Sequence, residues 1–210
     1  MVTAKRIIDK AISFVVLMIS APLFLLITLA IKLDDPGPVF FRQERVGRDR
    51  INFRIFKFRT MVIDAEKKGA GVFVGEDDPR ITRVGKILRS TSLDELPQLI
   101  NILKGDMSLV GPRPTLAYQV EKYDQAQLRR LAVKPGVTGW AQVNGRNMLT
   151  WPERIELDLW YIDNWTLWLD LKILFKTFLV VFSRQNLYRK KMEDPISGQD
   201  GNKGTDVKND

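Results

Sequence analysis

Two adjacent carboxylates, Asp94 and Glu95, are the residues of this chain best suited to chemistry. They lie between a basic run and a rigid Gly-Pro-Arg-Pro turn at residues 111–114; the run contains Arg80, Arg83, Lys86 and Arg89. The chain has no His and no Cys, so an acid, base, nucleophile or metal ligand must be mostly carboxylate, with Lys, Tyr or Ser as lesser options. Cations can hold a phosphate while carboxylates attack or bind a metal, so the arrangement points to metal-assisted chemistry on phosphate.

The local structure of the carboxylate pair admits two interpretations. An Asp-Glu pair alone usually means a charged first turn that favours the helix dipole. Asp94 is predicted to be the N-cap of a helix that stops at Gly105; Ser92 is an alternative cap through a Ser-x-x-Glu pattern, but it places Pro97 one turn inside the helix. Successive helical side chains point about 100° apart. The pair is therefore expected to divide its roles, one residue attacking and the other binding metal.

Cationic side chains are predicted on both sides of this pair. Prolines flank Arg113 and restrict its backbone, which favours a fixed contact with an anion. Residues 39–43 and 51–61 read as strands joined by a hairpin loop at 47–50. Apolar and basic residues partly alternate in the second strand, so one face can pack while the other presents basic groups or is simply solvated; these groups are Arg54, Lys57 and Arg59.

Composition limits the classes of protein that this chain can be. A length of 210 residues and a mass of 24.2 kDa fit one domain, or one domain with an anchor. The net charge of +8 predicts anionic partners: phosphate ligands, nucleic acid or an anionic membrane face. The absence of Cys excludes a disulfide framework and a thiolate zinc site.

Residues 11–31 carry no charge and are about long enough to cross a bilayer. A single spanning helix is one interpretation. However, Pro22 near the middle predicts a bend. Basic residues flank both ends of the segment, which is typical of cytoplasmic flanks. We therefore expect residues 1–33 to form a re-entrant membrane helix that enters and leaves on the same side, with Pro22 as its structural bend.

The rest of the chain is predicted to be a catalytic domain at residues 34–189, followed by a disordered tail at 190–210. The overall class is α+β and mainly helical, with one small β-hairpin. Within the domain we expect helices at 83–89 and 118–133, a mobile loop at 67–78 and an ordered loop at 134–147. A capping box at Thr150 opens another helix, and Thr166 caps the next.

Residues 168–182 are very apolar but contain Asp170, Lys172 and Lys176, so they form a poor spanning segment. Aromatic and aliphatic residues beside spaced lysines suit an amphipathic helix lying in the membrane interface. The alternative is an ordinary core helix.

Three longer motifs resemble those of a known family. They are KFRTM at 57–61, DPRITRVGKILRSTSLDELPQLINILKGDMSLVGPRP at 78–114 and KPGVTGWAQVNGRN at 134–147. They closely resemble the bacterial sugar transferases, the monotopic phosphoglycosyl transferases that start glycan assembly on a polyprenol phosphate. The likeness runs from about Lys5 to Phe182 and matches the short form of the family. In one departure, some members have Ser directly before the membrane-helix proline, whereas here Ala21 does and Ser20 is one residue earlier.

The resemblance implies a reaction and a set of roles. A nucleotide diphospho-sugar, normally a UDP-sugar, gives its sugar phosphate to the enzyme and UMP leaves; undecaprenyl phosphate then takes the sugar phosphate. By position in SLDELPQ, the resemblance makes Asp94 the nucleophile and Glu95 the Mg²⁺ ligand. The candidate substrate contacts are Lys57, Arg59, Arg80, Arg89, Gln98 and Arg113, with Asp158 and Tyr161 as residues that shape the site or only cap and pack.

These roles place the protein at the cytoplasmic face of a bacterial inner membrane, with membrane lipids as partners. No nucleic acid partner is expected in this interpretation, and a homodimer is left open. The alternative is a membrane-anchored basic module that binds nucleic acid or anionic lipid. That alternative gives no role to the Asp94–Glu95 pair or to Arg113. UMP release from a UDP-sugar separates the two interpretations.

Overall fold

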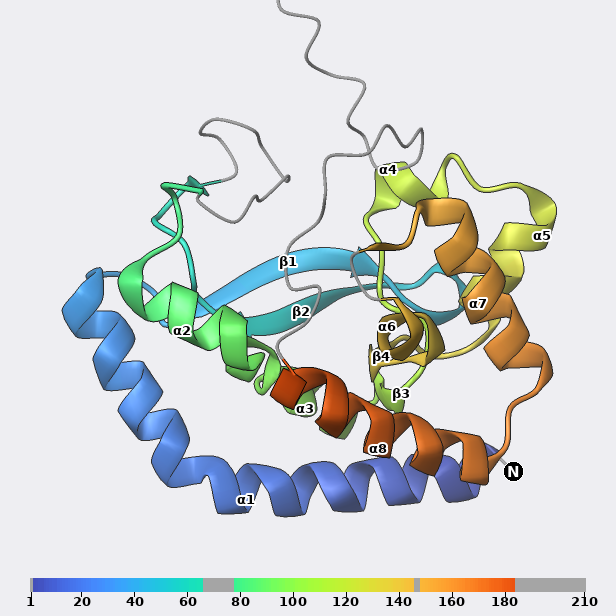
Figure 1. Cartoon of the computed structure of the whole chain (residues 1–210), viewed down its shortest axis with the longest axis horizontal. Helices are drawn as coiled ribbons and strands as arrows, with labels where there is room; N and C mark the ends of the chain where they lie inside the picture. The colour runs from blue at the N-terminus through green and yellow to red at the C-terminus, as the bar shows by residue number, and fades with distance from the viewer. Residues whose placement is uncertain (1, 66–77, 146–147, 184–210) are drawn as a thin grey trace, which may run out of the picture.

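A computed structural model describes residues 2–65, 78–145 and 148–183 (Figure 1). The described chain is mainly helical with two small two-stranded sheets, which confirms the predicted α+β class. A long helix, α1 (Val2–Asp34), runs along one side, and the rest of the fold lies on it. The expected tail at 190–210, and all of the expected 67–78 loop except its last residue, lie outside the described residues.

Helix α1 is bent about midway along its length in Figure 1 and contains Pro22. Proline removes a backbone donor and crowds the preceding turn, leaving carbonyl groups without their helical partners. The hydroxyl of Ser20 lies 2.7 Å from the carbonyl oxygen of Val16 and 3.3 Å from that of Leu17. These are back-bonds of a helical Ser to its own preceding turn, just before the carbonyl of Met18 that Pro22 leaves without its helical donor.

The first sheet is the predicted hairpin. Strands β1 (Phe40–Val46) and β2 (Asn52–Phe58) pair antiparallel, with Phe40 opposite Phe58. A short 3₁₀ turn, η1 (Arg48–Arg50), joins them. Strand β1 extends three residues beyond its predicted end, because pairing continues as far as Val46.

The carboxylate pair lies in a connection between two helices. Helix α2 (Arg83–Thr91) ends at Ser92, which has a left-handed backbone with φ of 57°. A 3₁₀ turn, η3 (Leu93–Glu95), follows directly. The predicted helix cap at Asp94 is therefore wrong, and so is the alternative capping box at Ser92. The left-handed residue ends one helix and redirects the chain before the next can begin.

Helix α3 (Gln98–Lys104) starts with Pro97 at its N-cap. Proline is well suited to this place because the first N–H groups of a helix have no helical partner. The helix stops at Gly105, as predicted, and that glycine has a φ of 95°.

A second sheet was not predicted. The short strands β3 (Ser108–Val110) and β4 (Gly136–Thr138) pair in parallel, and α6 (Trp140–Asn144) follows. The prediction of a loop across 134–147 is therefore wrong for most of its length. A Cβ atom at Gly136 would lie 2.1 Å from the backbone nitrogen of Gly111, so glycine is what allows these two segments to approach.

The predicted single helix at 118–133 is divided into three short pieces. They are α4 (Ala117–Val120), α5 (Gln125–Leu128) and the 3₁₀ helix η4 (Arg129–Ala132). The division occurs because Asp124 caps a new helix: its carboxylate accepts a hydrogen bond of 2.8 Å from the backbone of Gln127.

The last two helices begin at the capping residues that were predicted from the sequence. Helix α7 (Trp151–Asp163) begins after Thr150 with the predicted capping box. Helix α8 (Leu167–Ser183) begins after Thr166, whose hydroxyl accepts a hydrogen bond of 3.0 Å from the backbone of Leu169. Leu169 and Ile173 of α8 enter the largest hydrophobic core, which also receives residues from α3, β2 and β3.

Candidate active site

Glu95 is the centre of a three-way contact between distant parts of the chain. Its Oε1 atom lies 2.6 Å from Nζ of Lys57 and 2.8 Å from a terminal nitrogen of Arg113. Lys57 comes from β2, Glu95 from η3 and Arg113 from the turn after β3. The structure thus brings together three of the predicted site residues, with the Asp94 carboxyl beside them.

The two carboxylates differ in their electrostatics. Burial alone would raise the pKa of Glu95, but the charges and hydrogen bonds of Arg113 and Lys57 outweigh it and hold that pKa well below its usual range. Burial raises the pKa of Asp94, and the cations Lys57, Arg89 and Arg113 only partly oppose this. Glu95 is therefore firmly ionised, whereas Asp94 is the more basic carboxylate. This difference suits two roles rather than one shared role.

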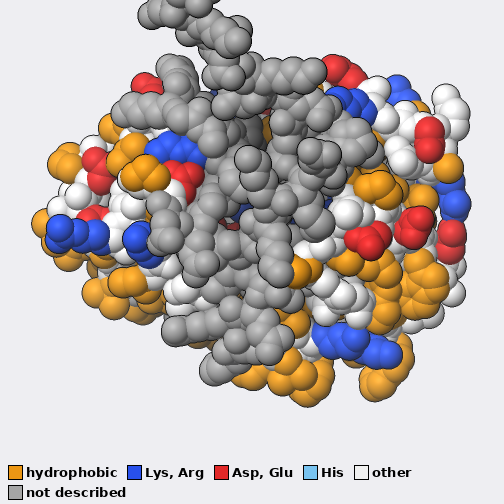
Figure 2. Space-filling model, turned by 45° about the horizontal axis from the view of Figure 1, so that its top comes forward, with side chains coloured by type: hydrophobic (Ala, Val, Ile, Leu, Met, Phe, Trp, Pro, Cys, Tyr) orange, Lys and Arg blue, Asp and Glu red, His pale blue; other side chains and the backbone are white. Residues whose placement is uncertain are grey.

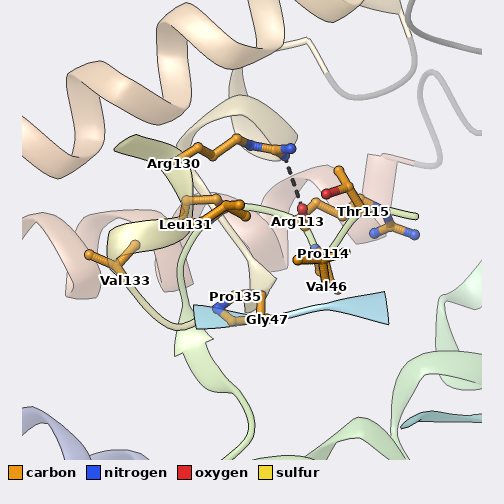
Figure 3. A pocket seen from close by; sticks show the side chains of 10 residues that line it. Val46, Gly47, Arg113, Pro114, Thr115, Arg130, Leu131, Val133 and Pro135 are labelled. Atoms are coloured by element: carbon orange, nitrogen blue, oxygen red, sulfur yellow. Dashed lines mark hydrogen bonds between the residues drawn. The ribbon is translucent and has the colours of Figure 1, made fainter. Parts of the chain in front are cut away.

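Several contacts fix the Gly-Pro-Arg-Pro turn that carries Arg113. The backbone of Gly136 donates to the carbonyl of Pro112 at 2.9 Å. The guanidinium of Arg130 donates to the carbonyl of Arg113 at 2.9 Å, the dashed line in Figure 3. The cavity in Figure 3 has a volume of about 10 Å³, room for roughly one water. This cavity is too small for a nucleotide sugar, so it is not the substrate site. The residues that line it pack around the turn.

Asp158 is linked to this turn through Arg130. Its Oδ2 atom is 2.6 Å from Nε of Arg130, and both side chains are 1% exposed. Another nitrogen of Arg130 donates to the Tyr123 hydroxyl at 2.7 Å. Asp158 thus reaches Arg113 through Arg130. Arg130 was not among the predicted site residues, because no sequence signal distinguishes it from its exposed neighbour Arg129.

Two of the predicted substrate contacts, Arg59 and Arg80, bind other parts of the chain. Arg59 forms an ion pair with Asp35 at the end of α1 and donates to the carbonyl of Pro38 at 2.6 Å. Arg80 forms an ion pair of 2.6 Å with Asp78 and donates to the carbonyl of Ala65 at 2.8 Å. Both arginines are buried. In the described part of the chain they join loop segments and do not contact the Asp94–Glu95 pair.

Arg89 and Gln98 lie closer to the pair in the chain. Arg89 donates to the Thr60 hydroxyl at 2.9 Å, and its charge also acts on Asp94. Gln98 is the first residue of α3 and is buried. Arg89 therefore contributes to the positive field around Asp94, and Gln98 starts the helix that supports the pair.

The hydroxyl of Tyr161 contacts β3 and α8. It donates to Asp170 at 2.7 Å and also lies 3.3 Å from the carbonyl of Val110. Burial and the charge of Asp170 raise the pKa of Tyr161 well above its usual range. Tyr161 is thus a neutral hydrogen-bonding group in this structure.

The described residues contain no group of three or more carboxylates that could form a complete metal cage. Mg²⁺ is often bound by only one or two carboxylates together with substrate phosphates. Asp94 and Glu95 supply oxygen donors of that kind, and both cations that contact Glu95 do so through Oε1. The residues present therefore fit a cation that arrives with a diphosphate.

A broad apolar surface accompanies the site. Figure 2 shows hydrophobic side chains gathered along the lower edge of the molecule, where α1 and α8 lie in Figure 1. Ile19 and Leu25 of α1 are 76% and 71% exposed, and Trp168 and Phe175 of α8 are 76% and 66% exposed. By length and composition, α1 could cross a membrane. A soluble protein rarely leaves so large an apolar surface uncovered.

Known proteins similar to this chain include several sugar transferases. A family model described as bacterial sugar transferase matches residues 1–184. An uncharacterized sugar transferase, EpsL, of Bacillus subtilis is 46% identical over 173 residues, which is 82% of this chain and 84% of that protein. The UDP-glucose:undecaprenyl-phosphate glucose-1-phosphate transferase of Escherichia coli is 43% identical over 192 residues, which is 88% of this chain and 41% of that protein.

The undecaprenyl-phosphate galactose phosphotransferase of Salmonella typhimurium is 42% identical over 198 residues. This match covers 88% of the chain but 41% of that relative, so the chain spans less than half the length of this relative and of the Escherichia coli one. The match to the family model covers most of the chain, including Lys57, Asp94, Glu95 and Arg113, which we call the Glu95 cluster. The chain therefore belongs to the bacterial sugar transferase family.

Proposed function

We propose that this protein transfers a sugar phosphate from a nucleotide diphospho-sugar, a UDP-sugar, to undecaprenyl phosphate. The names of the Escherichia coli and Salmonella relatives support this class of acceptor. The observation that carries the proposal is the Glu95 cluster: one ionised carboxylate fixed by Lys57 and Arg113, directly beside the more basic Asp94.

In the first step, a carboxylate oxygen of Asp94 attacks the phosphorus that bears the sugar. The bond from that phosphorus to the bridging oxygen breaks, and UMP leaves with this oxygen. The product is an acyl phosphate between Asp94 and the sugar phosphate. The partial burial of Asp94 favours attack because a carboxylate removed from water is more basic and less shielded.

In the second step, an oxygen of undecaprenyl phosphate attacks the same phosphorus. The bond between Asp94 and phosphorus breaks, which restores the carboxylate and gives an undecaprenyl diphospho-sugar. Arg113 and Lys57 remain fixed by Glu95 during both steps. They can therefore stabilise charge that develops on the phosphoryl oxygens without reorganising at that moment.

Glu95, with Asp94 nearby, would hold Mg²⁺, which supplies charge neutralisation at the diphosphate. Glu95 also holds the two cations close together despite their mutual repulsion, because both bind one of its oxygens. The residue would thus organise the positive charges of the site as well as bind the metal.

The exposed apolar surfaces of α1 and α8 would seat the protein on the cytoplasmic face of the inner membrane. Lys172 and Lys176 lie beside the exposed apolar residues of α8, with their ammonium groups over the Trp140 ring at 5.9 and 4.9 Å. In this seat α1 is re-entrant and α8 lies in the interface. The site then sits near the lipid headgroups, which is where the phosphate of the acceptor lies.

UMP release tests the proposal directly. The purified protein is incubated with a UDP-sugar, Mg²⁺ and undecaprenyl phosphate, and both UMP and lipid-linked sugar are measured. We expect one UMP for each lipid product. If a panel of UDP-sugars gives no UMP while the protein still binds nucleic acid or anionic vesicles, the binding-module interpretation replaces this one.

A further inference from the structure

The amino-terminal end of α1 is joined to the catalytic body by buried and partly buried polar side chains that the proposed reaction does not use. Lys5 and Asp9, one turn apart on α1, have side chains that are 17% and 9% exposed. Nζ of Lys5 binds Oδ2 of Asp170 on α8. The hydroxyl of Ser108 on β3 donates to Oδ2 of Asp9 at 2.6 Å. We refer to Lys5, Asp9, Ser108 and Asp170 as the α1 clasp.

Asp170 is the best satisfied member of the clasp. Its Oδ1 accepts from the Tyr161 hydroxyl at 2.7 Å, and its Oδ2 accepts from the indole nitrogen of Trp165 at 3.1 Å as well as from Lys5. A buried ion pair is stable only when such additional hydrogen bonds satisfy its remaining groups. The ring of donors around Asp170 therefore indicates a defined docking position for Lys5.

The same face of α1 follows the catalytic body along the rest of the helix. Ser13, one turn beyond Asp9, is fully buried, and Leu17 packs against the main core. Beyond the bend, Ile27 and Ile31 are buried in a second core with Phe58 of β2. Both ends of α1 thus rest on one body, polar at the first end and apolar at the second.

This arrangement has a consequence for membrane topology. The hydrocarbon core of a bilayer is about 30 Å thick. A straight, spanning α1 would carry Lys5 and Asp9 to the side opposite the catalytic body, beyond reach of Ser108 and Asp170. The clasp can close only when both ends of α1 lie on the same side.

We propose that the α1 clasp holds the amino terminus on the side of the catalytic body, and that basic flanking charge is not sufficient for this. Lys5, Asp9 and Asp170 are in this view positioning residues. The inference rests on the proposed membrane seat of α1, although it does not depend on the chemistry at Asp94. If flanking charge alone set the topology, neighbouring cations would contribute equally. The clasp instead distinguishes the partly buried Lys5 from the exposed Arg6.

The clasp also connects the anchor to the reaction site. Strand β3 runs from Ser108 into the turn that carries Arg113, and the Tyr161 hydroxyl lies 3.3 Å from the carbonyl of Val110. A change in the clasp therefore alters how the anchor is held relative to the Glu95 cluster. We expect it to raise KM for the membrane-bound acceptor more than it lowers UMP formation from the soluble donor.

The test uses full-length protein in bacterial membranes with one Cys introduced at Thr3, since the chain has no native Cys. A membrane-impermeant maleimide is applied from each side to the parent and to Lys5→Gln, Asp170→Asn and Arg6→Gln. Lys5→Gln and Arg6→Gln remove the same charge from the same flank, whereas Asp170→Asn leaves that flank unchanged. We expect the fraction of molecules labelled on the periplasmic side to rise at least tenfold for Lys5→Gln and Asp170→Asn, and to change less than twofold for Arg6→Gln.

Equal effects of Lys5→Gln and Arg6→Gln, with no effect of Asp170→Asn, would overturn the clasp in favour of flanking charge. A second measurement avoids dependence on variants that fold poorly. Cysteines at Asp9 and Ser108 leave the Lys5–Asp170 pair intact and should form a disulfide in oxidised membranes. Failure of this disulfide to form in a protein that still releases UMP would contradict the clasp while leaving the proposed reaction in place.

Discussion

Two pairs of an arginine and a carboxylate lie close together in this fold, and they differ mainly in exposure. Arg113 binds Glu95 with side chains 41% and 19% exposed, whereas Arg130 binds Asp158 with both side chains 1% exposed. The buried pair also donates to the backbone of Arg113, so one pair supports the other. The same residue types can thus serve chemistry where substrate can reach them and structure where it cannot.

The largest effect is expected at Asp94. Asp94→Asn keeps the shape of the side chain but removes the attacking charge, so turnover should fall by about four orders of magnitude or more. The melting temperature should change little, because Asp94 caps no helix in this structure. Near-normal turnover in the purified variant would mean that the nucleophile lies elsewhere.

Removal of the metal should come next in size. Activity is expected to vanish in excess chelator and to return with Mg²⁺ or Mn²⁺, because oxygen ligands and a diphosphate favour a hard cation. Glu95→Gln should lower turnover by roughly 10²- to 10³-fold and weaken the metal response. Titration of UMP release against Mg²⁺ measures both effects. Full activity in chelator would remove the metal from the proposal.

The buried pair should show the opposite pattern. Asp158→Asn leaves the Arg130 charge buried without its partner, which should lower the free energy of unfolding by about 3–5 kcal/mol and the melting temperature by roughly 10 °C. Glu95→Gln is the matched control and should shift the melting temperature much less. Equal shifts in melting temperature for the two variants would contradict the assignment of a structural role to the Arg130–Asp158 pair alone.

A smaller effect is expected on α8. Lys176→Glu places a negative charge beside anionic headgroups and removes a contact with Trp140, so membrane retention should fall by about 1 kcal/mol per lysine changed. Lys172→Glu should add to it, whereas Lys122→Glu, on an exposed connection away from α1 and α8, should not. Vesicle sedimentation and KM for undecaprenyl phosphate measure this. Unchanged sedimentation of the double variant would argue against an interfacial α8.

The smallest expected effect is a shift in pH dependence. Only ionised Asp94 can attack, and its pKa is raised, so UMP formation should decline on acidification at a higher pH than for an ordinary aspartate. Glu95 contributes to that raised value through its negative charge. The residual activity of Glu95→Gln should therefore decline at lower pH than the parent. A shift toward higher pH would contradict the electrostatic coupling of the two residues.

The elements that depend on local sequence signals were predicted correctly. The hairpin, the stop at Gly105 and the capping box at Thr150 depend on residues close together in the chain, and all three were confirmed. Pairing of β3 with β4 joins segments 28 residues apart in register, Ser108 with Gly136, and each strand is too short to have its own periodicity. The prediction that Asp94 caps a helix was wrong because Ser92 has a left-handed backbone. Tertiary contacts impose that conformation, and a Ser residue does not indicate it in the sequence.

The candidate site shows the same division. Asp94, Glu95 and Arg113 could be selected because charge and proline pattern are visible in the sequence, and their family motifs are long. Arg130 could not, since an arginine that is buried looks in sequence like its exposed neighbour Arg129. Which of the candidate arginines contact the pair also depends on distances between elements, which no local pattern specifies.

The most direct measurement of the proposed chemistry is the intact mass of the protein after reaction with a UDP-sugar when no lipid acceptor is present. We predict that the parent gains the mass of one sugar phosphate with one equivalent of UMP, that Asp94→Asn gains none, and that added undecaprenyl phosphate removes the adduct from the parent. Lipid-linked product formed at full rate with no adduct at any time, or an equal adduct on Asp94→Asn, would contradict a covalent intermediate on Asp94.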